Sequence, residues 1–128
     1  VLRGRRSRAP PVTSTPMFVG VQRLVLHIPG ARSLKDRRQV VRSFKDRVQA
    51  RLRVSIAEVG DVEHPQHATI AVAVVSNEAA QCDEVLERVA AAASTLPDAI
   101  LADRANEIIP LGFGGSGIRG GIGEQGDD

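Results

Sequence analysis

Hydrophobic and polar positions follow two different periods along this chain, and each change of period marks the boundary of an element. Residues 17–28 alternate with period two, which predicts a strand with Phe18 and Leu24 on one face and Arg23 on the other. Residues 32–53 place their apolar positions within one arc of about 120°, which predicts an amphipathic helix. The members of that arc are Leu34, Val40, Val41, Phe44, Val48 and Leu52.

Four further elements follow from the same pattern. Residues 54–60 and 68–75 predict two strands joined by a turn at 61–66, and the second of them is nearly all small or β-branched. Residues 76–94 predict a second helix, and residues 99–109 a fourth strand. Each helix has a candidate cap. Ser33 stands at the start of the first, with Asp36 three positions later, and Ser76 and Asn77 stand at the start of the second.

The order strand, helix, strand, strand, helix, strand predicts an α+β fold, the ferredoxin-like βαββαβ sandwich. Its antiparallel sheet has the spatial order 4-1-3-2, with both helices on one face. The other face is then open to solvent and includes Val19, Val21 and Val25. Because an apolar sheet face of this kind is seldom left uncovered, we expect a homodimer or another partner to pack on it.

Composition limits the domain to the middle of the chain. Residues 1–16 are rich in Arg, Pro, Ser and Thr, which predicts a disordered basic arm, and the glycine-rich residues 110–128 predict a disordered tail. Residues 17–109 are left as one domain, with an aliphatic core because aromatic residues make up only 2% of the chain. The single cysteine, Cys82, permits no internal disulfide. With no export signal and no apolar run of membrane-spanning length, we expect a cytoplasmic protein without a membrane partner.

Charge is divided unevenly and indicates the class of partner. Residues 32–53 hold nine basic residues and two acids, whereas residues 54–128 hold three Arg and thirteen acids. Within the first helix, four cations and Gln49 gather in an arc of about 80°. The cations are Lys35, Arg38, Arg42 and Lys45. Since no acid interrupts this stripe, it predicts contact with the phosphate backbone of RNA; a solvated helix face and a protein partner are the alternatives.

A second candidate site depends on topology. The first and third strands are expected to be adjacent and parallel in this fold, so both helices should begin at the same edge of the sheet. Their exposed N–H groups predict an anion site there. Its members are Arg32, Ser33, Lys35, Arg37, Ser76 and Asn77. Two ordinary helix caps are the alternative. Arg37 and Arg51 fall on the apolar arc, so each must form an ion pair or extend to solvent.

Other motifs carry weaker signals. His64 and His67, with Asp61 and Glu63, resemble metal ligands in composition, but they lie in a short turn, so we expect a solvated hairpin and no metal. Residues 112–117 match the G-x-G-x-x-G pattern without a helix to follow, and we expect no nucleotide cofactor there. Cys82 lies among apolar helix positions and should be a core residue. His27, at the end of the first strand, should lie on a surface or dimer interface.

Four segments of the chain together resemble the YlxP-like family of small bacterial proteins. They are 17-MFVGV-21, 27-HIPGARSLKDRR-38, 57-AEVG-60 and 74-VVSN-77. The resemblance covers about residues 17–109 and implies a ferredoxin-like fold. It also implies a connection to RNA or the ribosome, because members are often encoded beside translation and ribosome-maturation factors. The family has no established catalytic residues to transfer.

The expected function is therefore a non-enzymatic, RNA-associated accessory protein near the ribosome, with no cofactor. Recognition of RNA on the sheet face needs aromatic residues on the central strands, and residues 68–75 contain none. A dimeric structural or ligand-sensing module, paired through the open sheet face, is the main alternative. A third is a hydrolase of the acylphosphatase type using Arg32, although the glycine-rich phosphate cradle of that family is absent.

Overall fold

A computed structural model describes residues 15–60 and 63–112 of the chain. Six elements occur in the predicted order: β1 (Met17–His27), α2 (Leu34–Arg51), β2 (Ser55–Val59), β3 (His67–Ser76), α3 (Ala79–Ser94) and β4 (Ile100–Leu111). Strand β4 runs two residues beyond the predicted end because Pro110 and Leu111 still pair with β1. Most of the predicted arm and most of the predicted tail lie outside the described residues.

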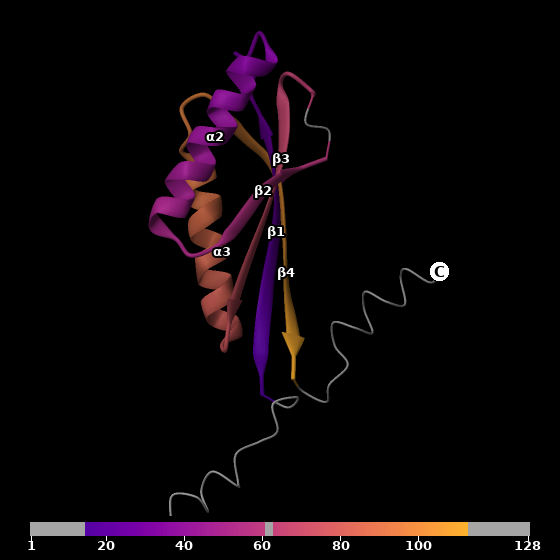
Figure 1. Ribbon diagram of the computed structural model, residues 1–128, viewed down its shortest axis with the longest axis vertical. Coiled ribbons are helices and arrows are strands. Elements are labelled where there is room, and N and C mark those ends of the chain that lie inside the picture. The colour runs from indigo at the N-terminus through magenta and orange to yellow at the C-terminus, as the bar shows by residue number, and fades with distance from the viewer. Residues whose placement is uncertain (1–14, 61–62, 113–128) are drawn as a thin grey trace, which may run out of the picture.

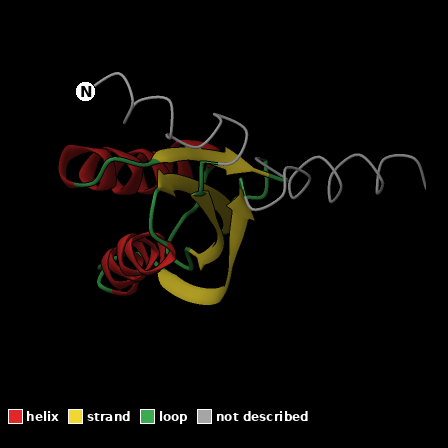
Figure 2. Ribbon diagram, turned by 90° about the horizontal axis from the view of Figure 1, so that it is seen from below, coloured by secondary structure: helices red, strands yellow, loops and turns green. Residues whose placement is uncertain are grey.

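The four strands form one antiparallel sheet in the order β2-β3-β1-β4 (Figure 1). This is the predicted order 4-1-3-2, and with two helices packed on the sheet it confirms the ferredoxin-like α+β fold. Both helices lie on the same side of the twisted sheet, and neither α2 nor α3 covers the opposite face (Figure 2). The register of β1 with β4 shifts between Val25 and Leu26, where Ala102 bulges out of the ladder.

The core lies between the sheet and the helices, where the inward side chains of β1 and β3 meet the apolar faces of α2 and α3. Phe44 is the aromatic residue at its centre and is fully buried. Its large aliphatic neighbours are likewise fully buried: Leu24, Leu26, Ile28, Ile70, Leu86, Val48 and Val89. Cys82 belongs to this core with 0% exposure, which confirms its predicted structural place. Burial of aliphatic area of this kind is the main term that stabilises the domain.

Helix α3 packs unusually close to β1 because of one glycine. A Cβ atom added at Gly20 would come within 3.1 Å of Cys82 Cβ and of Leu86 Cδ1. Two residues along, Gln22 is 3% exposed and donates from Nε2 to the carbonyl of Leu86 at 2.9 Å. The same amide group reaches Asn106 Oδ1 of β4 at 3.0 Å, so one buried side chain connects β1, α3 and β4.

The two helices run in opposite directions along the sheet, because β1 and β3 are antiparallel. The pairs Phe18 with Ser76 and His27 with His67 place the end of β3 beside the start of β1. Helix α2 therefore begins at one end of the sheet and α3 at the other (Figure 1). Among the described residues, neither helix is both long and apolar enough to span a bilayer.

Candidate nucleic-acid interface

Helix α2 begins at the cap that its sequence predicts. Ser33 adopts an extended conformation, with φ −154° and ψ 166°, and its hydroxyl accepts from the backbone N–H of Asp36 at 3.2 Å. The Asp36 carboxylate accepts from the backbone N–H of Arg32 at 3.0 Å. This reciprocal pair satisfies groups that a helix start leaves without partners, and the acid also complements the helix dipole. The first turn of the basic helix is therefore well defined.

The buried face of α2 determines which of its basic residues are exposed to a binding partner. Val41, Phe44 and Val48 are buried against the sheet, and the arginine on the same arc, Arg37, is also buried, with 0% exposure. These four positions set the rotation of the helix about its axis. The basic stripe, about a third of a turn away, consequently faces outward.

Arg37 connects α2 to the β2–β3 hairpin. Its guanidinium forms an ion pair with Glu58 of β2, whose side chain is 17% exposed, and its Nε donates to the carbonyl of His67 at 2.9 Å. This pairing confirms the prediction that a charged residue on the apolar arc needs a partner. It also corrects the expectation that Arg37 contributes to an anion site, because its charge is neutralised inside the fold.

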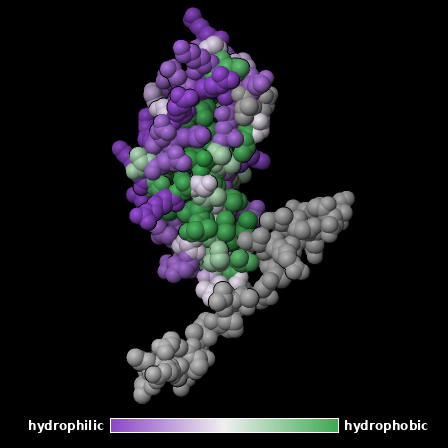
Figure 3. Space-filling view, viewed as in Figure 1, coloured by the Kyte–Doolittle hydropathy of each residue, from purple (hydrophilic) through white to green (hydrophobic). Residues whose placement is uncertain are grey.

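The four stripe residues lie along about 15 Å of the outer face of α2. Lys35, Arg38 and Arg42 are exposed and Lys45 is half-buried. None of the four forms an ion pair with any residue in the described ranges 15–60 and 63–112. The hydrophilic surface over α2 and the hydrophobic surface lower down the strands are visible together in Figure 3. Arg and Lys in a row of this kind match the repeated charge of a phosphate backbone.

The predicted anion site at the helix starts is wrong, because its two halves are separated. It assumed that β1 and β3 are parallel, whereas Phe18 pairs with Ser76 and His27 pairs with His67 in an antiparallel ladder. Arg32, Ser33 and Lys35 therefore lie at one end of the sheet, and Ser76 and Asn77 at the other. The Ser76 hydroxyl accepts from the backbone N–H of Glu78 at 3.1 Å, as an ordinary turn.

The open sheet face is apolar, as the strand pattern predicts. Val19, Val21 and Val25 of β1 are half-buried on this face, beside Ala71 and Ala73 of β3. At its margins Val75 is 66% exposed and Val59 is 39% exposed. Arg23 is the cation of β1 on this face, and it pairs across the sheet with Ala105 of β4.

Three histidines meet at one corner of the sheet, which sequence reasoning did not anticipate. The ring of His67 stacks on His64 with centroids 4.5 Å apart, and meets the ring of His27 edge-on at 4.9 Å. The antiparallel register of β1 and β3 was the signal that could have placed His27 opposite His67. Within the described residues, no group of three or more His, Cys, Asp and Glu side chains is arranged to hold a metal ion.

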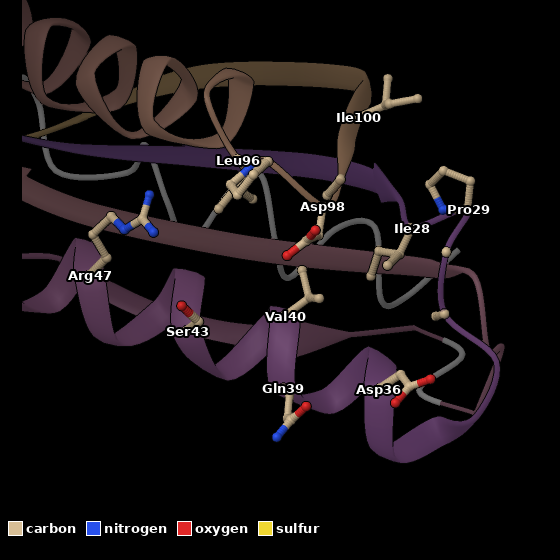
Figure 4. A pocket seen from close by; sticks show the side chains of 14 residues that line it. Ile28, Pro29, Asp36, Gln39, Val40, Ser43, Arg47, Leu96, Asp98 and Ile100 are labelled. Carbon is tan, nitrogen blue, oxygen red and sulfur yellow. The ribbon is translucent and has the colours of Figure 1, made fainter.

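Two cavities follow the seam between the helices, and sequence reasoning missed both. The larger, of about 620 Å³, lies between the first half of α2 and the loop from α3 to β4 (Figure 4). The smaller, of about 400 Å³, lies between the second halves of α2 and α3 and is lined by Arg47, Arg51 and Arg88. Arg47 lines both. Helical periodicity places Arg47 on a flank of α2, but only the tertiary packing shows that α3 brings Arg88 to the same flank.

One known protein is similar to this chain in sequence, and one solved structure superposes on part of it. The "Uncharacterized protein YlxP" of Bacillus subtilis (strain 168) is 35% identical over 68 residues, which cover 53% of this chain and 74% of that protein. A designed protein, "De novo designed protein Foldit4", shares 10% identity and superposes with a TM-score of 0.42 over 73% of this chain and 96% of its own.

The match to a protein family is more extensive. The family described as "Protein of unknown function (DUF503)" aligns with residues 19–105, which run from the third residue of β1 to the middle of β4. This span contains both helices and the whole basic stripe. Together with the identity to YlxP, it confirms the resemblance noted from the sequence motifs. The chain therefore belongs to the YlxP-like family described as DUF503.

Proposed function

We propose that this protein is a non-enzymatic accessory factor that binds the phosphate backbone of RNA along the outer face of α2. The observation that supports this most strongly is the stripe of Lys35, Arg38, Arg42 and Lys45, which no described acid neutralises. A buried cluster holds the helix that carries it, so the cations are presented from a rigid element. The resemblance to the YlxP-like family suggests that this RNA belongs to the ribosome or to a maturing ribosomal particle.

Binding through phosphate is favoured over reading of bases. The central strand β3 has the sequence HATIAVAVVS, without Phe, Tyr or Trp, so the sheet face has no stacking platform on that strand. Phe18 of β1 packs with the core cluster on the helix side. Recognition should therefore depend on charge and on the shape of the RNA, with little discrimination between sequences.

The charge distribution orients the complex. Beyond α2, the described chain carries acids on α3 and β4, among them Asp83, Glu84 and Asp103. These carboxylates repel a polyanion, whereas α2 attracts one. The two halves of the molecule thus favour a single approach, with RNA along α2 and α3 turned away from it.

The salt dependence of RNA affinity tests the proposal. For four phosphate contacts to single-stranded RNA, the logarithm of the affinity should fall with the logarithm of salt concentration with a slope of about −3. Fluorescence anisotropy of a labelled RNA oligomer, titrated with the full chain at several salt concentrations, measures that slope. In the variant with Arg38→Gln and Arg42→Gln, two contacts are lost and the slope should fall to about −1.4.

The matched control is Arg23→Gln, which removes one positive charge from the opposite side of the sheet. Its slope should equal that of the unmodified protein, because a distant charge makes no direct phosphate contact. A double variant with the unmodified slope would show that the stripe does not carry RNA binding, and the proposal would then be abandoned.

The open sheet face supports a second candidate function, a homodimeric structural or ligand-sensing module. Its basis is the exposure of Val75 and Val59 at the margins of a face whose centre is Val, Ala and Thr. Two copies that pack these faces together would bury the apolar area of both. Sedimentation equilibrium should then give a dimer, and Val21→Glu should return it to a monomer. The variant with Arg38→Gln and Arg42→Gln should remain a dimer; a monomeric unmodified protein at high concentration would exclude this candidate.

A further inference from the structure

The groove between the second halves of α2 and α3 has the features of an anion site. Arg47 and Arg51 of α2 line it from one side and Arg88 of α3 from the other, around a space of about 400 Å³. Its remaining lining is apolar or small: Val48, Leu52, Ala91, Ala92 and Thr95. No carboxylate is among the described residues that line it.

Within residues 15–60 and 63–112, none of the three guanidinium groups has the acidic partner that usually accompanies clustered arginines. Arg88 is the one basic residue of α3, and Glu87 beside it forms its ion pair with Arg104 of β4. Neither Arg47 nor Arg51 forms an ion pair within the described ranges. Three like charges along one groove repel one another, and a bound anion would relieve that repulsion. The planar fork of arginine suits a phosphate or carboxylate group.

The groove and the larger cavity adjoin at Arg47, the one described residue that lines both. The larger cavity has an apolar floor that includes Ile28, Val40 and Leu96. Apart from Arg47, the polar residues that line the larger cavity are uncharged or acidic. Ser43 and Asp36 line it from α2, and Asp98 points its carboxylate from the α3–β4 loop toward α2 (Figure 4). The combined seam is therefore positive at one end and negative at the other.

We propose that this seam binds a phosphate monoester with an uncharged, hydrogen-bonding body, such as a nucleoside monophosphate or a sugar phosphate. The phosphate lies among Arg47, Arg51 and Arg88, and the body occupies the larger cavity. There it packs on Val40 and donates hydroxyl or amino groups to the carboxylate of Asp98. A monoester carries about −1.5 to −2 charges at neutral pH, so it suits three arginines better than the single charge of a phosphodiester.

The polarity of the seam also defines what it excludes. A ligand with an anion at both ends would place its second charge beside Asp36 and Asp98, which repel it. The groove and the larger cavity together are lined by apolar residues and a few convergent polar groups, which is typical of small-molecule sites. The inference goes beyond the proposed RNA contact, because Arg47 and Arg88 lie on a different flank from the stripe.

Isothermal titration calorimetry of the full chain tests this site with five probes: inorganic phosphate, nucleoside 5′-monophosphates, glucose 6-phosphate, uncharged nucleosides and a dinucleoside phosphodiester. We expect one of the two monoester classes to bind at submillimolar concentration, at least tenfold tighter than inorganic phosphate, the matching nucleoside or the phosphodiester. Which class binds identifies the body of the ligand. Arg88→Gln should weaken that binding at least tenfold, because it removes one wall of the groove.

Arg42→Gln is the matched control. It also removes one arginine charge, but from the stripe on α2, and should leave monoester affinity unchanged. If no monoester binds at millimolar concentration, or if Arg88→Gln binds as the unmodified protein does, the proposal is overturned. Inorganic phosphate that binds as tightly as the monoesters would also overturn it, because the larger cavity would then hold nothing. These outcomes are separate from RNA binding, which Arg42→Gln weakens and Arg88→Gln does not.

Discussion

Replacing Arg37 with alanine should lower the free energy of unfolding by about 3–5 kcal/mol, because it leaves the partners of a buried cation without it. The substitution removes the ion pair to Glu58, whose side chain is only 17% exposed, and the hydrogen bond to the His67 carbonyl. Each hydrogen bond that involves a charged group contributes about 1.5–3 kcal/mol, so two of them account for this size. A small domain has a total stability of about 5–15 kcal/mol, so the loss is a large share of it.

Urea denaturation followed by far-ultraviolet circular dichroism measures this loss, because the chain has no Trp or Tyr to report by fluorescence. The neighbouring Arg38→Ala is the matched control: it removes the same side chain from the same helix at an exposed position and should change stability by no more than about 0.5 kcal/mol. Equal losses for the two variants would refute the argument that the Arg37 contacts stabilise the fold.

A double-mutant cycle separates the pair from its surroundings. Glu58→Leu alone leaves the Arg37 guanidinium buried without its carboxylate and should cost about 3 kcal/mol. Arg37→Met, also made alone, is the second single change, and Arg37→Met with Glu58→Leu removes both charges. The double variant should then be more stable than the sum of these two single changes predicts, by about 2 kcal/mol. Simple additivity would show that the ion pair itself contributes nothing to stability.

Three further changes probe the packing around the helices. Gly20→Ala should destabilise the domain by about 1–2 kcal/mol, because the new Cβ would meet Cys82 and Leu86 at 3.1 Å, whereas Gly30→Ala, with nothing within 4 Å, should be neutral in the same urea titration. Ser33→Ala should cost about 1 kcal/mol by removing the acceptor of the Asp36 N–H, and Ser33→Asp should restore most of it; equal melting temperatures for the two variants would contradict the capping role. Phe44→Ala should cost about 3–5 kcal/mol and Phe44→Leu clearly less, and a mild effect of the alanine variant on the urea midpoint would place Phe44 outside the core.

The sequence predicted those features that depend on one element or on the order of elements. Helical periodicity is local, so it placed Phe44 in the core and Arg37 on the same arc, and from this the need for a buried partner followed. It could not say that the partner is Glu58, because that contact depends on how α2 lies across β2. The order of elements was sufficient for the fold, since few topologies accommodate it.

The mistaken anion site shows where such reasoning stops. The strand order 4-1-3-2 is right, but β1 and β3 are antiparallel and not parallel as predicted, and only a parallel pair would place Ser33 beside Ser76. Because β1 and β3 are antiparallel, α2 and α3 start at opposite ends of the sheet. Side chains of the two helices come together along the seam between them and not at their starts. Arg47 and Arg88 lie there because two helices far apart in sequence pack together, which no local pattern encodes.

The positions of the two outer strands have a consequence for self-association. An outer strand offers unpaired N–H and C=O groups to any neighbouring chain, and a long, flat one invites aggregation. Here β2 is only five residues long, and β4 carries Asp103 and Arg104 beside a bulge at Ala102 and has Pro110 near its end. Short length, charge, proline and a bulge are the devices by which natural sheets resist growth at their edges. Copies of this protein that meet face to face, as the second candidate function requires, can therefore stop at two instead of extending into a fibre.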